Sequence, residues 1–335
     1  MMADAGELLV MLLVILIAAE VFTNALEHLG ERLGISEGVT GSLFAAVGTA
    51  MPESMVPLLA FFAGTGHAAL DQEIGIGAIL GAPLMLSTLS LFLMGMSVIR
   101  KRGANGVLSP EPTGLKRDLN FFLMAFSIAI VALFPVARSP GVHAALAIIL
   151  LFIYFIYVMM TLRVSAQLVR DGHGTEAHHD MFLCRVGMPD NMVTVILQLL
   201  IGLALLVAGA KGFIYGVEQT AHHLGISALL LSLLIVPIAT ELPEKVNSII
   251  WIRRRKDTLA FGNITGAMVF QGTILPAMGL LFTPWEARPE IVLGLIITSA
   301  AAVWLRILVW SDKLRVWHLC VNGSLYAVYI TLMVG

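Results

Sequence analysis

Residues 237–245 read Pro237-Ile-Ala-Thr-Glu-Leu-Pro-Glu-Lys245 and place two carboxylates, Glu241 and Glu244, in an otherwise apolar part of the chain. An ionised side chain at the centre of a bilayer costs about 2.5 kcal/mol or more, so such residues usually face a partner, a cavity or an ion. Pro243 has no N–H and therefore frees a carbonyl of the preceding helical turn. Because carbonyls and carboxylates are hard oxygen ligands, the stretch predicts a cation site at membrane depth.

The same arrangement occurs earlier in the chain, in Gly48-Thr-Ala-Met-Pro-Glu53. Other short segments also recur, the first two at one common displacement and the third after a shorter connection. They are Leu33-Gly-Ile-Ser36 with Leu224-Gly-Ile-Ser227, Pro52-Glu53 with Pro243-Glu244, and Gly77-Ala-Ile-Leu-Gly81 with Gly262-Asn-Ile-Thr-Gly266. We infer that the chain is a tandem duplication.

The composition is that of a membrane protein. Of the 335 residues, 58% are hydrophobic and 13% are charged, and the mean hydropathy is +0.91, which is too apolar for a soluble globule. The acidic N-terminus lacks the basic region of a signal peptide, so the first apolar run is expected to remain as a span. Cys184 and Cys320 form no pair pattern, and neither a disulfide nor a zinc framework is expected. No cofactor and no nucleic acid are expected; the expected partners are the lipid bilayer and small inorganic cations, and the oligomeric state stays open.

Apolar runs of about 20 residues predict ten membrane-spanning helices. They cover about 7–30, 37–65, 72–99, 118–137, 141–163, 191–221, 226–252, 257–282, 290–310 and 315–334. The expected fold is therefore an all-α polytopic membrane protein with two five-helix repeats, 1–163 and 191–335, whose motif-bearing parts are about 37–99 and 226–282. An odd number of spans per repeat inverts the second copy, as in many secondary transporters.

Positive charge in the connections supports this topology. The connections after odd-numbered spans carry Arg32, Arg100, Lys101, Arg102, Lys116, Arg117, Arg163, Arg170, Arg185, Arg253, Arg254, Arg255, Lys256, Lys313 and Arg315. The other side has only Arg138 and Arg288. Because cytoplasmic loops are enriched in Lys and Arg, the odd-numbered connections are expected in the cytoplasm and both termini outside, with the protein in the cytoplasmic (inner) membrane.

The predicted cytoplasmic linker, 164–190, contains Asp171-Gly-His-Gly-Thr-Glu-Ala-His-His-Asp180. The spacing of these residues matches no strict metal-ligand motif. A solvated linker is the favoured interpretation, and a weak regulatory or adventitious metal site is the alternative.

The chemistry is expected to centre on Glu53 and Glu244, which occupy equivalent positions of the two repeats. The pseudo-two-fold axis of an inverted repeat is expected to bring them face to face near the midplane, where they would form a metal site for a cation. Calcium prefers six to eight oxygens, and further oxygens are available from Thr49, Thr240 and the carbonyls freed by Pro52 and Pro243. In the alternative reading, each glutamate only hydrogen-bonds a helix break.

Glu241 has no counterpart in the first repeat, where Ala50 holds its place. We interpret Glu241 as a cation ligand or proton carrier, because adjacent carboxylates disfavour each other's ionisation. The alternative is an internal partner for Lys245 or Lys211. Lys245 points about 100° around the helix from Glu244, and we expect it to pair on another helix face.

Two pairs of glycines, Gly77 with Gly81 and Gly262 with Gly266, have the spacing that lets a neighbouring helix backbone come close. Gln271 follows the second pair, whereas Leu86 holds the matching place after the first pair. The second copy is therefore expected to supply more polar ligands, Gln271 among them.

These residues resemble the cation/calcium antiporter superfamily, whose two repeats each carry Gly-Thr-Ser-x-Pro-Glu followed by Gly-Asn-x-x-Gly-Ser-Asn. The resemblance implies that Glu53 and Glu244 are the principal calcium ligands and that Thr49 and Thr240 contribute to flanking sodium sites. Motif serines are replaced by Ala50, Glu241, Ala82 and Ala267, and Leu86 and Gln271 replace other polar positions. These departures make the chain a divergent member and leave sodium or proton coupling open.

The functional hypothesis is a secondary active antiporter that exchanges a divalent cation, with calcium first, for sodium or protons by alternating access. Spans one and six are expected to move against the core formed by spans two, three, seven and eight. The alternatives are an antiporter or channel for another cation, and a membrane-embedded hydrolase with paired carboxylates. No intramembrane serine or histidine accompanies the glutamates, so we do not expect an enzyme.

Overall fold

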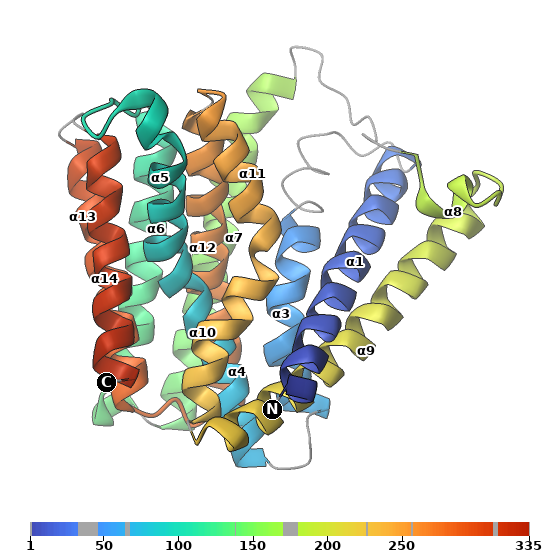
Figure 1. Cartoon of the computed structure of the whole chain (residues 1–335), viewed down its shortest axis with the longest axis horizontal. Coiled ribbons are helices and arrows are strands. Elements are labelled where there is room, and N and C mark those ends of the chain that lie inside the picture. The colour runs from blue at the N-terminus through green and yellow to red at the C-terminus, as the bar shows by residue number, and fades with distance from the viewer. Residues whose placement is uncertain are drawn as a thin grey trace.

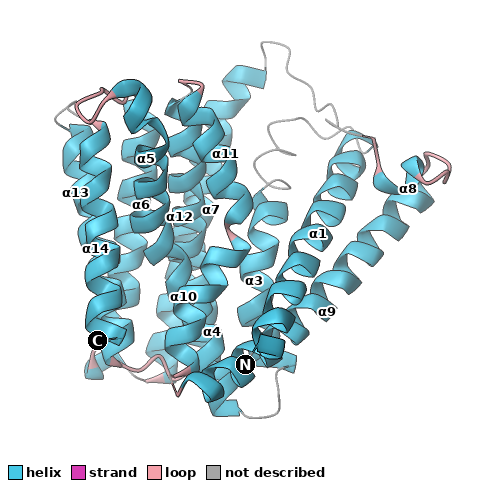
Figure 2. Ribbon diagram, in the orientation of Figure 1, coloured by secondary structure: helices cyan, strands magenta, loops and turns pink. Residues whose placement is uncertain are grey.

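The computed structural model describes residues 2–32, 46–63, 68–137, 139–169, 180–225, 227–255, 257–310 and 314–334. Inside the helices a few side chains lie outside this description, among them those of Thr49, Pro52, Pro243 and Glu244. The described ranges consist of helices joined by short loops (Figure 2). Their only strand-like pairing is an isolated bridge between Val107 and Arg315. The all-helical prediction is confirmed.

The helices run roughly parallel to one another as a bundle (Figure 1). In chain order they are α1 (Met2–Arg32), α3 (Ala46–Ala63), α4 (Ala68–Met85), η2 (Leu86–Ser90), α5 (Leu91–Arg102), α6 (Pro112–Val131), η3 (Pro135–Ala137), α7 (Pro140–Val169), α8 (Phe182–Arg185), α9 (Met192–Leu224), α10 (Ala228–Thr240), α11 (Leu242–Arg253), α12 (Asp257–Phe282), α13 (Pro289–Trp310) and α14 (Val316–Val334). Both chain ends lie at the same end of the bundle (Figure 1).

Within the part of the chain that the structure describes, six helical segments are long and apolar enough to cross a membrane, judged by length and composition. They are Ala68–Arg102, Pro140–Thr161, Met192–His223, Ala260–Phe282, Pro289–Trp310 and Val316–Met333. The apolar parts of α3 and α10, Glu53–Phe62 and Ala228–Pro237, are shorter. The membrane-protein class therefore agrees with the sequence, while the ten-span inverted repeat stays a prediction.

Helices α1 and α9 lie side by side along much of their length and tilt away from the rest of the bundle (Figure 1). Glycines spaced seven residues apart on α9 make this contact possible. A Cβ at Gly202 would lie 2.9 Å from Phe22 Cβ, and one at Gly209 would lie 3.0 Å from Ile15 Cγ1. The residues seven apart share a helix face, so α1 and α9 form a closely packed pair.

The segment from α4 to α5 contains a π-helical turn, η2, at Leu86–Ser90. Such a turn leaves a main-chain carbonyl without its usual helical partner. Asn322 of α14 donates from Nδ2 to the carbonyl of Ser87 at 2.7 Å, and both side chains are fully buried. The π turn therefore fixes α14 against the middle of this long helical segment.

At one end of the bundle, Arg102 joins the end of α5 to the start of α12. Its guanidinium donates two hydrogen bonds to the carboxylate of Asp257, both at 2.8 Å. The second oxygen of Asp257 also accepts from the main-chain N–H of Ser109 at 2.9 Å. A bidentate pair of this kind fixes orientation as well as distance, so the two helix ends are held in register.

Glu111 caps α6 and gives the fold a pH-dependent contribution. Its carboxylate accepts from the main-chain N–H of Thr113 at 2.7 Å and of Gly114 at 2.6 Å. The hydrogen bond from Gly114 is the largest influence that lowers the pKa of Glu111 below its usual value. A lowered folded-state pKa adds stability above the unfolded-state pKa, and this stability is lost as pH falls through the folded-state pKa.

We therefore expect Glu111→Ala to lower the free energy of unfolding by about 1 kcal/mol at neutral pH, as for the loss of other N-caps. The difference from wild type should shrink as the pH falls below the folded-state pKa, because the protonated carboxyl is a weaker cap. Thermal unfolding of the two proteins across this pH range measures the difference. Glu286→Ala, which removes an exposed carboxylate of a loop, is the control; an equal pH profile for both variants would contradict the capping role.

Candidate cation site

Three buried polar side chains from three helices meet in the interior. Glu53 lies on α3 and is 3% exposed, whereas Glu241 and Gln271 are fully buried. Glu241 occupies the one-residue break between α10 and α11, with φ −101° and ψ 11°. Pro243 stands in the first turn of α11, where its missing N–H is tolerated. The proline thus ends α10 and restarts the helix, as the sequence predicted for this stretch.

Gln271 of α12 links the two carboxylates. Its Nε2 lies 2.8 Å from Glu241 Oε1 and 3.2 Å from Glu53 Oε1, and it donates a hydrogen bond to each. The other end of the same amide, Oε1, is buried and has no hydrogen-bond partner among the described residues. A neutral amide cannot cancel two negative charges. The cluster therefore combines two buried carboxylates with an amide oxygen, Gln271 Oε1, that can still accept a hydrogen bond or coordinate a cation.

Lys245 also belongs to this cluster. Its side chain is almost fully buried, and Nζ lies 2.8 Å from the carbonyl oxygen of Pro237 and 4.0 Å from Glu241 Oε2. The expectation that Lys245 would pair on another helix face was therefore wrong. Lys245 instead contacts Glu241, four residues earlier. Helical hydrogen bonding resumes after the break, because the Lys245 main-chain N–H donates to the Glu241 carbonyl at 3.1 Å. The two side chains are therefore neighbours on one helix face.

The other predicted ligands are placed differently or lie outside the description. Thr240 is buried, and its hydroxyl donates to the Val236 carbonyl of its own helix at 3.1 Å. The side chains of Thr49, Pro52, Pro243 and Glu244 are not described, so the facing of Glu53 and Glu244 stays a prediction. Among the described side chains, no group of three or more His, Cys, Asp or Glu is close enough to hold a metal ion.

The histidine-containing stretch of the linker cannot be compared with its prediction. Residues 170–179 lie outside the described part of the chain. Nearby, Phe182 at the start of α8 donates its main-chain N–H to Asn24 Oδ1 of α1 at 3.2 Å. The same Asn24 oxygen accepts from Gln198 Nε2 of α9 at 2.9 Å. The polar residue Asn24 of the first span thus joins the paired helices α1 and α9.

The two glycine pairs differ in their surroundings. A Cβ at Gly77 would lie 2.6 Å from the Leu229 carbonyl oxygen, and one at Gly81 would lie 2.2 Å from that of Leu233. Both contacts are to the backbone of α10. A Cβ at Gly262 would meet nothing within 4 Å among the described residues, and one at Gly266 would meet only Tyr157 Oη, at 3.6 Å. The close backbone approach expected of both pairs is thus found for the first pair alone.

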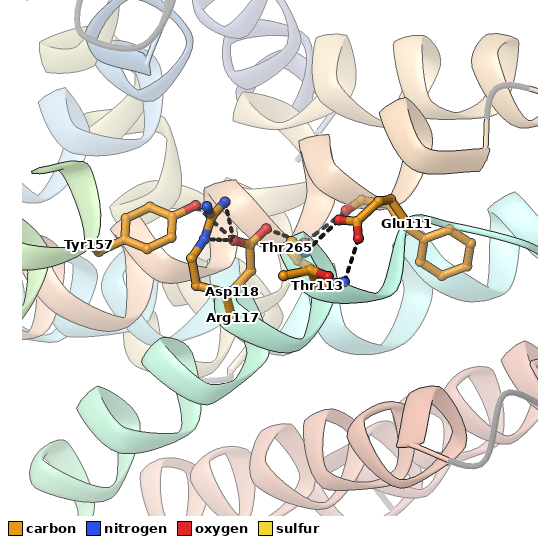
Figure 3. A network of polar contacts seen from close by, with 8 residues as sticks. Glu111, Thr113, Arg117, Asp118, Tyr157 and Thr265 are labelled. Carbon is orange, nitrogen blue, oxygen red and sulfur yellow. Dashed lines mark hydrogen bonds and ion pairs between the residues drawn. The ribbon is translucent and has the colours of Figure 1, made fainter. Parts of the chain in front are cut away.

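A second buried polar cluster, not identified from the sequence, joins α6, α7 and α12 (Figure 3). Asp118 of α6 accepts from Thr265 Oγ1 at 2.9 Å and from Tyr157 Oη at 3.2 Å. Arg117 pairs with the same carboxylate at 3.2 Å and lies over the Tyr157 ring. Each acceptor oxygen of Asp118 has a donor, so the cluster is a satisfied structural network. The adjacent Arg117-Asp118 pair at the start of an apolar helix is the sequence signal that could have found it.

Comparison with known proteins adds a family match, two relatives and a solved structure. The family model described as sodium/calcium exchanger protein matches residues 5–163 and 194–335. Inner membrane protein YrbG of Escherichia coli (strain K12) is 23% identical over 94% of this chain and all of its own length. Putative antiporter CaxA of Alkalimonas amylolytica is 25% identical over 82% of this chain and 80% of its own.

The crystal structure of the H⁺/Ca²⁺ exchanger CAX superposes on this chain with a TM-score of 0.73 at 16% sequence identity. The superposition covers 99% of this chain and 82% of that one, which shows a common fold.

Proposed function

This chain belongs to the sodium/calcium exchanger protein family, and we propose that it is a secondary antiporter that exchanges calcium, or another cation, for sodium ions or protons. The resemblance found in the sequence is confirmed at the level of the family. With its long apolar helices, the chain is an integral membrane protein. We place it in the inner membrane, as the name of the Escherichia coli relative suggests, with both termini outside.

The observation that carries the proposal is the buried carboxylate pair. Glu53 and Glu241 come from different helices and share one amide, Gln271, in the interior of the bundle. Buried carboxylates are costly unless they are paired or hold a cation. The free Oε1 of Gln271 and the Pro237 carbonyl oxygen, which lies 2.8 Å from Lys245 Nζ, are hard ligands of the kind that calcium prefers. In this proposal Glu53 and Glu244 are the central cation ligands, and Glu241, Thr49, Thr240 and Gln271 surround them.

The arrangement of the helices suggests how access could alternate. The site is built on α3, the break between α10 and α11, and α12, whereas α1 and α9 form a closely packed pair tilted against these helices (Figure 1). Movement of one packed unit against another around a fixed site is a common route to alternating access. We assign the moving part to α1 and α9, because their tight mutual packing lets them move as one body.

The test is ⁴⁵Ca²⁺ uptake into proteoliposomes that contain the purified protein. Outward sodium and outward proton gradients are imposed separately, with the membrane potential clamped by potassium and valinomycin. We expect uptake above that of empty liposomes with one of the two gradients and none without an opposing ion. Uptake that needs no opposing ion would indicate a channel, and no uptake under either gradient would contradict calcium exchange.

A further inference from the structure

We propose that the ammonium of Lys245 is a built-in cation of the transport site. It takes the position of one monovalent metal ion and so reduces the number of ions that the protein binds. This inference rests on the proposed antiport function and assigns to Lys245 a role in ion specificity. The relevant geometry lies at the break between α10 and α11, opposite α4.

Lys245 Nζ lies where a main-chain carbonyl and a carboxylate, two ligand types of monovalent cations, come close to each other. It lies 2.8 Å from the Pro237 carbonyl oxygen and 4.0 Å from Glu241 Oε2. A main-chain carbonyl at a helix break beside a carboxylate is a typical ligand set for sodium in transporters. The third neighbour, Met85 Sδ of α4 at 2.8 Å, is a weak acceptor. The carbonyl belongs to the last turns of α10, where it also accepts from the Glu241 N–H at 3.3 Å, and the carboxylate belongs to the break that follows.

Lys245 also differs from a lysine that only neutralises a surface charge. Lysines near helix ends usually extend along apolar surface until the ammonium reaches water, whereas the Lys245 side chain is 7% exposed. Its Nζ lies 2.8 Å from the Pro237 carbonyl oxygen, whereas Glu241 Oε2 is more than 1 Å further away. The ammonium therefore lies between the last turns of α10 and the break at Glu241.

The charges of the site explain the role that we propose for the Lys245 ammonium. When ionised, Glu53 and Glu241 bring two negative charges to the described part of the site, the proposed ligand Glu244 adds a third, and Lys245 offsets one of them. Removing the ammonium takes a positive charge away from the buried carboxylate of Glu241, which is costly in a low-dielectric interior. A mobile cation of the same charge can restore the balance. Sodium is the probe for it, because hard oxygens suit it and the vacated volume is small.

The test measures ²²Na⁺ binding to the purified full-length protein in detergent. Lys245→Met removes the charge and keeps the length of the side chain, whereas Lys245→Arg keeps the charge and is the control. We expect Lys245→Met to bind one more Na⁺ per chain than wild type, and Lys245→Arg to bind as many as wild type. Lys245→Leu, which also removes the charge and offers no donor to the Pro237 carbonyl, replaces Lys245→Met if the latter does not fold, with the same expected gain.

Equal Na⁺ binding by wild type and the folded uncharged variant would overturn the proposal and reduce Lys245 to a structural role. In proteoliposomes, the uncharged variant is also expected to require Na⁺ for calcium uptake beyond the requirement of wild type. The binding assay does not depend on transport. If wild type exchanges no ions at all, the antiport function fails, while the comparison of bound Na⁺ still decides the role of Lys245.

Discussion

Glu53→Gln is expected to reduce calcium uptake by at least about a hundredfold, because losing one charged partner from a buried site costs about 3–5 kcal/mol and each 1.4 kcal/mol is a factor of about ten. The substitution is nearly isosteric. Glu53 is buried on α3 and accepts a hydrogen bond from Gln271. The side-chain oxygen of a glutamine at position 53 can accept the same hydrogen bond. The fold should therefore survive while the charge that attracts the cation is lost.

Uptake per reconstituted protein molecule measures this effect, with thermal unfolding as the check on folding. Glu290→Gln is a matched control, because Glu290 lies at the start of α13 and pairs with Arg288 at 3.7 Å, away from the site. It should transport like wild type. The same loss is expected of Glu244→Gln, whose side chain lies outside the described residues. Wild-type uptake by a folded Glu53→Gln protein would contradict the assignment of Glu53 as a ligand.

Gly81→Val is expected to prevent the correct packing of α4 against α10. Even the first atom of the new side chain would lie 2.2 Å from the Leu233 carbonyl oxygen and 2.7 Å from Pro237 Cγ. Overpacking a core costs about 1–3 kcal/mol, and the cost here should reach or exceed that range because the obstacle is backbone. Moving α10 away would also displace Pro237, whose carbonyl accepts from Lys245 in the site.

The melting temperature and the size-exclusion profile of the purified variant measure this effect. Gly262→Ala is the control, because a Cβ there meets nothing within 4 Å in the described part of the chain. Alanine is about 1 kcal/mol better than glycine in a helix, so this variant should be at least as stable as wild type. A Gly81→Val protein as stable as Gly262→Ala would show that α4 and α10 do not pack as described.

Local features of the fold could be predicted from the sequence. Apolar runs located the helices, and Pro243 marked the disturbed turn, where the helix breaks at Glu241. These properties depend on residues within a few positions of each other. The number of membrane spans is less local, and within the described residues six segments are long and apolar enough to cross a membrane.

The site itself could be predicted only in part, because its contacts join distant helices. Gln271 was noted as a polar residue, but its hydrogen bonds to Glu53 and Glu241 depend on how α3, α10 and α12 pack. Lys245 was expected to pair on another helix face than Glu244, but its contact with Glu241, one helical turn away, is the alternative that the sequence offered for Glu241. The Asp118 cluster was missed because its partners lie on helices far apart in the sequence.

The position of a bound cation tests the central claim most directly. Crystals of the protein grown with Sr²⁺, a heavier stand-in for Ca²⁺, would reveal the ion by its anomalous scattering. We expect a peak at coordination distance, about 2.3–2.6 Å for calcium and slightly more for strontium, from the carboxylate of Glu53 and from Gln271 Oε1. A saturated protein whose only peaks lie elsewhere, for example beside Asp118, would contradict this site.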